Sequence, residues 1–72
     1  MNATTAERRI ELVKQMREHE VAVMELSSLS TNRAVYQKHG NILFRIAAQQ
    51  AKASEQKLLD VTKEKMQKLN SL

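Results

Sequence analysis

Apolar residues, with one histidine among them, recur along the first third of the chain at alternating intervals of four and three positions. The series is Leu12, Met16, His19, Val23 and Leu26. This is the spacing of the a and d positions of a coiled coil. No Gly or Pro interrupts residues 7 to 31, and Thr4 with Glu7 has the pattern of a capping box. We therefore expect a helix over residues 7–31.

Further apolar residues lie beside this seam, at Ile10, Val13, Val21 and Leu29. A stripe that is wider than one seam favours more than one packing neighbour. Ser, Thr and Asn fill most of residues 27–32. Their side chains compete for backbone hydrogen bonds, so the helix is expected to weaken there.

A second seam occupies the last third of the chain. It consists of Leu59, Thr62, Met66 and Leu69, with Leu58 and Val61 widening it. Residues 48–71 contain no Gly or Pro and are predicted to be helical. A helix of about 25 residues is roughly 37 Å long at 1.5 Å per residue. Two seams of matched length predict that the segments fold back on each other as an antiparallel pair.

Between the two helices the pattern changes to a period of two. Residues 34–38 and 42–46 flank Lys38-His39-Gly40-Asn41, which holds the only glycine and reads as a turn. The second of these segments alternates between one face with Ile42, Phe44 and Ile46 and another with Leu43 and Arg45. The sequence thus predicts a β-hairpin over residues 34–46. The predicted fold class is mainly α, an antiparallel two-helix coiled coil with a central β-hairpin, in one domain spanning residues 1–72.

The predicted hairpin calls for a partner. A lone two-stranded hairpin is marginal in water, and its free edges invite pairing with other strands. We expect it to complete a sheet or barrel with strands of other chains. The expected subunit-interface residues are Val35, Tyr36, Ile42, Leu43, Phe44 and Ile46.

Composition supports this need for a partner. A chain of 72 residues buries a modest fraction of its surface, and without Cys it has no disulfide to stabilise it. The net charge of +4 is mild, and acidic residues are interleaved with basic ones. No apolar run approaches the length of a membrane span, and the first residues lack the apolar core of a signal peptide. We expect a cytoplasmic protein that also enters the nucleus.

Residues suited to catalysis or to metal binding are scarce. There is no Cys nucleophile, no Ser has an evident base beside it, and the carboxylates are predicted on solvent faces. His19 lies in a helix and His39 in the turn, so they are not expected to form a ligand pair. For His19 we expect a half-exposed ring without a charged partner on its face. The sequence predicts no enzyme, no cofactor and no metal site.

Two other functions compete with that of an assembling subunit. The lysines near the C-terminus could bind nucleic acid, but no aromatic platform accompanies them and Asp60 and Glu64 dilute their field; they are Lys57, Lys63, Lys65 and Lys68. A solvated helix face explains them better. The other alternative is a plain coiled-coil scaffold. The aliphatic hairpin argues against a plain scaffold, which has no use for it. Salt dependence of binding would distinguish nucleic-acid binding from assembly with other subunits.

The hairpin and the residues before it resemble a known family. The runs that carry the resemblance are Ala22-Val23-Met24-Glu25-Leu26-Ser27-Ser28-Leu29, Asn32-Arg33-Ala34-Val35-Tyr36 and Gly40-Asn41-Ile42-Leu43-Phe44, with Leu59-Asp60 further on. Helix, hairpin and helix with these motifs resemble a β-type prefoldin or prefoldin-like subunit, closest to the prefoldin-like module of the PAQosome. The similarity covers about residues 15–70. One departure is Thr62, where the prefoldin-like sequence has a larger apolar residue.

The resemblance implies a function. Prefoldins are hexamers of two α-type and four β-type subunits whose hairpins form a double β-barrel, with the helices hanging from it. The prefoldin-like module works with RuvB-like ATPases in a co-chaperone assembly that matures multi-subunit complexes. The implied partners are other prefoldin-type subunits, those ATPases, and unfolded or unassembled client proteins. The implied client contacts are at the helix tips, namely Ile10, Leu12, Met66, Leu69 and Leu72.

Overall fold

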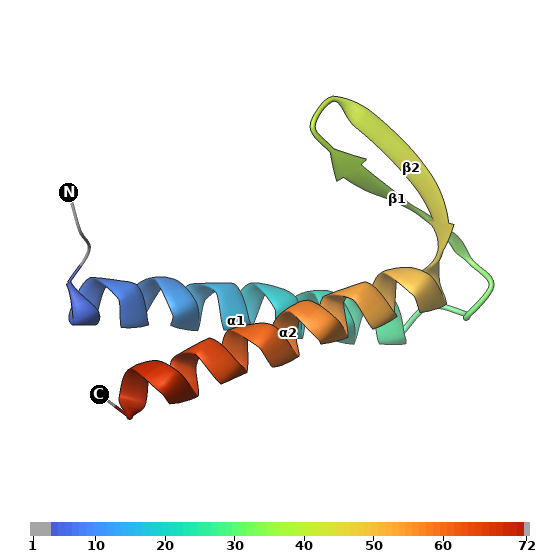
Figure 1. The fold of residues 1–72 in the computed structure, drawn as a ribbon. Helices are drawn as coiled ribbons and strands as arrows, with labels where there is room; N and C mark the ends of the chain where they lie inside the picture. Colours follow the sequence, from blue (N-terminus) through green and yellow to red (C-terminus); the bar gives the residue numbers. More distant parts are fainter. Residues whose placement is uncertain (1–3, 72) are drawn as a thin grey trace.

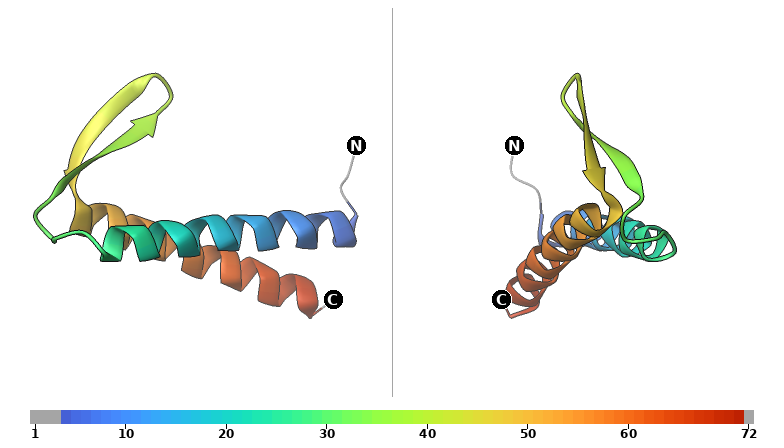
Figure 2. Two further views of the ribbon diagram at one scale, coloured as in Figure 1. Left: turned by 180° about the vertical axis from the view of Figure 1, so that it is seen from behind. Right: turned by 90° about the vertical axis from the view of Figure 1, so that its right-hand side faces the viewer.

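The computed structural model describes residues 4–71 and contains two helices joined through a β-hairpin (Figure 1). Helix α1 spans Thr5–Ser27, strand β1 Ala34–His39, strand β2 Ile42–Ala47 and helix α2 Ala48–Asn70. The helices run antiparallel and side by side, and they diverge toward the ends that carry the chain termini (Figures 1 and 2). The predicted antiparallel helix pair with a hairpin between its helices is confirmed.

Helix α1 begins at Thr5, two residues before the predicted start at residue 7, and Thr4 is its N-cap, as the capping pattern indicated. The Thr4 hydroxyl oxygen accepts a hydrogen bond from the Glu7 amide at 3.1 Å, which satisfies one of the free N–H groups of the first turn. The helix ends at Ser27, four residues before the predicted end. The hydroxyls of Ser27 and Ser28 donate to the carbonyls of Val23 and Glu25. Serine hydroxyls that bond backward in this way weaken a helix terminus.

Helix α2 begins directly after β2 and has no side-chain cap. Its first amides instead donate to backbone carbonyls of the segment that enters the hairpin. The Ala48 amide donates to the Arg33 carbonyl at 2.7 Å, and the Gln49 amide to the Thr31 carbonyl at 3.4 Å. These bonds satisfy two of the free N–H groups at the helix start and fasten the helix to the root of the hairpin.

The hairpin strands are each one residue longer than predicted, so His39 is the last residue of β1 and not part of the turn. Gly40 and Asn41 form the two-residue loop, and Gly40 has φ +61°. A glycine with positive φ at the first of two loop residues is typical of a type II′ hairpin turn, which matches the twist of the strands. The glycine therefore sets the register of the hairpin.

The core lies between the helices and is small. Within residues 4–71 the buried side chains are Leu12, Ala48, Ala51, Leu59 and Thr62. The hairpin stands to one side of the helix pair and packs against α2 only (Figure 2). The molecule measures 42 × 25 × 13 Å along its principal axes. Such an elongated shape with a thin core leaves much of the apolar surface uncovered.

Candidate functional site

The strand register divides the hairpin side chains between two faces. Val35 pairs with Ile46, Gln37 with Phe44 and His39 with Ile42, so these six residues share a face. The predicted alignment of Ile42, Phe44 and Ile46 on one face is confirmed. The other face carries Ala34, Tyr36, Lys38, Leu43, Arg45 and Ala47.

Large apolar side chains are exposed on both faces of the hairpin. On one face Ile42 is 60% and Phe44 46% exposed, and on the other Tyr36 is 68% and Leu43 65% exposed. Val35 and Ile46, near the root, are half-buried. The ring of His39 meets that of Phe44 edge to face at 5.5 Å between centroids, a preferred geometry for ring pairs. The four exposed side chains form a two-sided apolar surface at the far part of the hairpin.

The edges of the hairpin are also open. In the described part of the chain the sheet has two strands, and each pairs with the other along one side. The outer side of each strand thus presents N–H and C=O groups that an added strand could bond. The hairpin combines apolar faces with free edges, which is the arrangement that a strand-to-strand interface requires.

The helix seam residues lie where the spacing placed them. Leu12, Leu59 and Thr62 are buried, and the remaining seam positions are half-buried; these are Met16, His19, Val23, Leu26, Met66 and Leu69. The Thr62 hydroxyl donates to the Leu58 carbonyl at 2.8 Å. A satisfied hydroxyl can be buried at small cost, so the short polar residue at this position is compatible with close helix packing.

His19 corrects an expectation from the sequence. Its ring Nδ1 lies 2.6 Å from Oε2 of Glu55 on the opposite helix, and both side chains are part-buried. His19 therefore has a charged partner, which a search along its own helix face could not find. A signal for Glu55 was present, because it lies four positions before Leu59 and so continues the seam of α2 backward. Ala51 and Ala48 continue it further, and both are buried.

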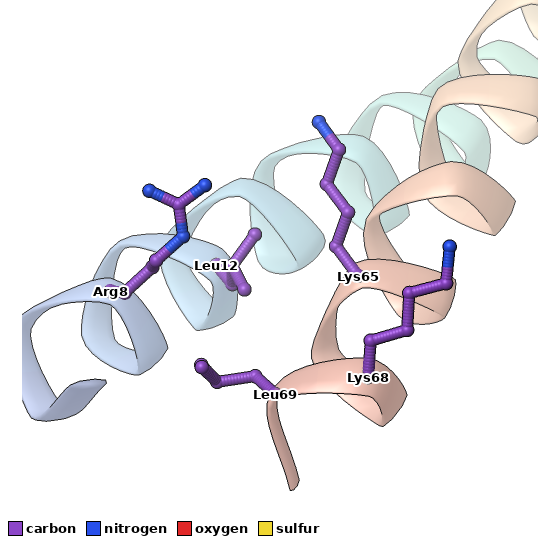
Figure 3. A pocket seen from close by; sticks show the side chains of 5 residues that line it. All are labelled: Arg8, Leu12, Lys65, Lys68 and Leu69. Carbon is purple, nitrogen blue, oxygen red and sulfur yellow. The ribbon is translucent and has the colours of Figure 1, made fainter. Parts of the chain in front are cut away.

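The open end of the helix pair holds a groove, named here the tip groove and lined by Arg8, Leu12, Lys65, Lys68 and Leu69 (Figure 3). Its volume is about 280 Å³. Figure 3 shows the two leucines at the space between the helices and the three cationic side chains around them. Lys68 Nζ lies 3.5 Å from Glu64 Oε1, an exposed pair on one helix. The tip groove is thus an apolar floor with a cationic rim.

The predicted client contacts are only partly brought together. Leu12 and Leu69 line the tip groove, and Met66 is half-buried one turn away from Leu69. Ile10 is highly exposed and lines a different hollow on the outer side of α1, so it does not belong to the same site. Leu72 lies outside the described residues. Arg9 Nε donates to Asn70 Oδ1 at 3.2 Å and joins the two helix ends beside the groove.

Within residues 4–71 no helix has a stretch that is both long and apolar enough to cross a bilayer. Over the same residues, no three His, Asp or Glu side chains gather in a way that could hold a metal ion. No protein-family model matches the chain, and a search of curated proteins finds no significant match.

Proposed function

We propose that this chain is a non-catalytic, β-type prefoldin-like subunit that acts as a co-chaperone within a hetero-oligomer. The observation that carries the proposal is the hairpin, which has apolar side chains exposed on both faces and open edges on both strands. Ile42, Leu43 and Phe44 in water cost free energy that burial in an assembly would recover. The resemblance of residues 32–44 to prefoldin hairpins agrees with this use.

A plain helical scaffold explains the helices but not the hairpin. In a plain scaffold, a short polar loop is enough to join two helices with matched seams. Six-residue strands are not required for that purpose. The hairpin of this chain is fastened to α2 by backbone hydrogen bonds at its root and carries Tyr36 and Phe44 far from the helix core. An element that is both held in position and unburied is suited to an interface.

In this proposal the hairpin enters a multi-chain β-barrel and the helices hang from it as a supercoiled pair. The tip groove then lies at the end farthest from the barrel and contacts unfolded or unassembled clients. Its leucines offer apolar contact, while Arg8, Lys65 and Lys68 favour client segments with carboxylates beside an apolar residue. The host is a prefoldin or the prefoldin-like module that works with RuvB-like ATPases, in the cytoplasm and nucleus.

The deciding experiment compares two substitutions in the hairpin. Phe44→Lys would place an unpaired charge in the barrel core, which is strongly unfavourable. Lys38→Ala changes an exposed residue and should alter stability by no more than about 0.5 kcal/mol. Tagged variants are expressed in cells, and the co-purified prefoldin-type subunits and ATPases are quantified. We expect Phe44→Lys to lose them and Lys38→Ala to retain them.

The helical circular dichroism of each purified variant serves as the control for folding. Phe44 is exposed in the isolated chain, so its replacement should leave the helices intact. Normal co-purification of a folded Phe44→Lys variant would refute the barrel interface and leave the scaffold as the better function. The identity of the recovered subunits also separates a general prefoldin from the prefoldin-like module.

A further inference from the structure

A second apolar stripe runs along α1 on the side turned away from α2. Ile10 is 70%, Val21 51% and Met24 72% exposed, and Val13 is half-buried. With 3.6 residues per turn, these four residues and Arg17 fall within an arc of about 80° on the far side of the helix from Leu12. The hairpin packs against α2 and not against α1, so it does not cover this outer stripe.

The outer stripe reads the same in both directions. Its positions are separated by three, four, four and three residues, with Arg17 at the centre and Ile10 and Met24 at the ends. An antiparallel copy of the same helix, related by a two-fold axis at Arg17, would therefore place apolar residues level with apolar residues. Ile10 would lie opposite Met24, and Val13 opposite Val21. A self-complementary patch of this kind is what a two-fold interface requires.

The charges of α1 also favour an antiparallel pairing. Residues 7–17 carry four cations and two carboxylates, whereas residues 18–27 carry three carboxylates and no Lys or Arg. A parallel copy would set like charges beside each other, and an antiparallel copy sets the basic half against the acidic half. Lys14 would then lie near Glu18 of the second copy, and Arg17 could reach Glu20, since these positions differ in level by about two or three residues, or 3–5 Å.

The basic half of the outer stripe is also hollowed. A shallow hollow of about 520 Å³ is lined by Arg9, Ile10, Val13, Lys14, Arg17 and Glu18. The antiparallel arrangement brings Met24 of the second copy level with Ile10 and over this hollow. Methionine is long, flexible and suited to filling an irregular space, and Met24 is among the most exposed side chains of the chain.

We propose that two copies of this chain pair through the outer stripes of α1, antiparallel and with a two-fold axis at Arg17. The stripe is about 21 Å long, so the interface is small and the pairing weak and transient. Arg17 on the axis fixes the register at a cost in stability, as single polar residues in helix seams do. The pairing does not depend on the proposed function, because it leaves the hairpin free and can join two free chains or two assemblies.

A cysteine placed on the axis tests the register. The chain has no Cys, so a single introduced thiol reports one position. In Arg17→Cys the two thiols would face each other across the axis, whereas in Glu11→Cys they would be about 18 Å apart along the helices and could not bond. Both variants carry Phe44→Lys to prevent association through the hairpin. Under mild oxidation we expect Arg17→Cys to form disulfide dimers several-fold faster than Glu11→Cys, and equal rates would overturn the proposal.

A mixture of two single-cysteine variants tests whether the paired α1 helices are antiparallel. Ile10→Cys and Met24→Cys should give the mixed disulfide in preference to either homodimer if the helices are antiparallel. Predominance of the homodimers would mean a parallel or nonspecific association and would refute the proposal.

A charge exchange tests the ion pairs without any cross-link. In chains that also carry Phe44→Lys, Lys14→Glu and Glu18→Lys should each lower the dimer fraction in sedimentation equilibrium at low salt, and the variant with both charge exchanges should restore it. A double variant that is no better than the two single variants would show that these residues do not face each other.

Discussion

His19 and Glu55 join the two helices of this protein through a contact of 2.6 Å between Nδ1 and Oε2. Their side chains are 22% and 24% exposed, so the contact is partly shielded from water by the helices that carry it. A polar pair inside an otherwise apolar seam restricts how the helices can slide, because a shift in register would leave both groups part-buried and unpaired. The pair is therefore a register device as well as a contact.

A double-mutant cycle measures this contact. Replacing His19 by Leu, Glu55 by Leu and both together should give a coupling free energy of about 1 kcal/mol from urea unfolding. The exposed pair Lys68 and Glu64, at 3.5 Å, provides the control and should couple by no more than about 0.5 kcal/mol. Equal coupling in the two cycles would mean that the shielding of the central pair has no energetic effect.

The small core predicts a strong contrast between two adjacent leucines of α2. Leu59 is 5% exposed, and Leu59→Ala should destabilise the helix pair by about 2–5 kcal/mol. Leu58 is 48% exposed, and Leu58→Ala should cost less than about 1 kcal/mol. Helical circular dichroism on urea titration checks both, and similar midpoints for the two variants would contradict the packing described.

A substitution at the turn residue Gly40 should affect the stability of the hairpin through backbone conformation and not through steric crowding. A Cβ added there would meet no heavy atom within 4 Å, but φ is +61°. Gly40→Ala should therefore destabilise the hairpin by about 1–3 kcal/mol through strain alone, because the first loop residue of a type II′ turn has a positive φ that L residues rarely adopt. Cross-strand NOEs between residues 37 and 44 report the hairpin, with Asn41→Ala as the control. Intact NOEs and unchanged stability in Gly40→Ala would show that the turn can take another form.

The separation of the hairpin from the tip groove predicts that assembly and client binding can be lost independently. Leu69→Ala removes part of the groove floor and should leave co-purification with prefoldin-type subunits nearly unchanged. The same variant should suppress the aggregation of an unfolded client less well in a light-scattering assay of the purified complex. Loss of assembly as complete as that of Phe44→Lys would refute this division between the two ends.

The elements that follow from local patterns were predictable from the sequence. The seam spacing located Leu12, Leu59 and Thr62 in the core, and the alternation in residues 42–46 located the faces of β2. The weakening of the helix over residues 27–32 was predicted from its Ser, Thr and Asn content, but the end at Ser27 was not, because apolar spacing continues to Leu29 while the backward bonds of the serine hydroxyls end the helix first. A hydrogen-bond competition of this kind has no signature in hydrophobic periodicity.

The contacts between distant segments were harder to foresee. Glu55 faces His19 across 36 positions of sequence, and a periodicity argument made on one helix at a time cannot pair them. Lys65 and Lys68 had the spacing of a solvated helix face, yet the fold brings Arg8 of the other helix beside them at the tip groove. Both contacts depend on how the two helices are rotated and shifted relative to each other. That arrangement depends on where the hairpin places the start of α2.

The bonds from Ala48 and Gln49 to the carbonyls of Arg33 and Thr31 make the root of the hairpin an elbow built from main chain alone. The angle between the hairpin and α2 depends on these backbone bonds and not on the identity of a capping side chain. Substitutions of the nearby side chains should therefore leave this angle unchanged. If the hairpin rotates relative to the helix pair, either the first turn of α2 rotates with it or both hydrogen bonds break. A shift at the base of the hairpin would therefore also shift the start of α2, the helix that packs against α1.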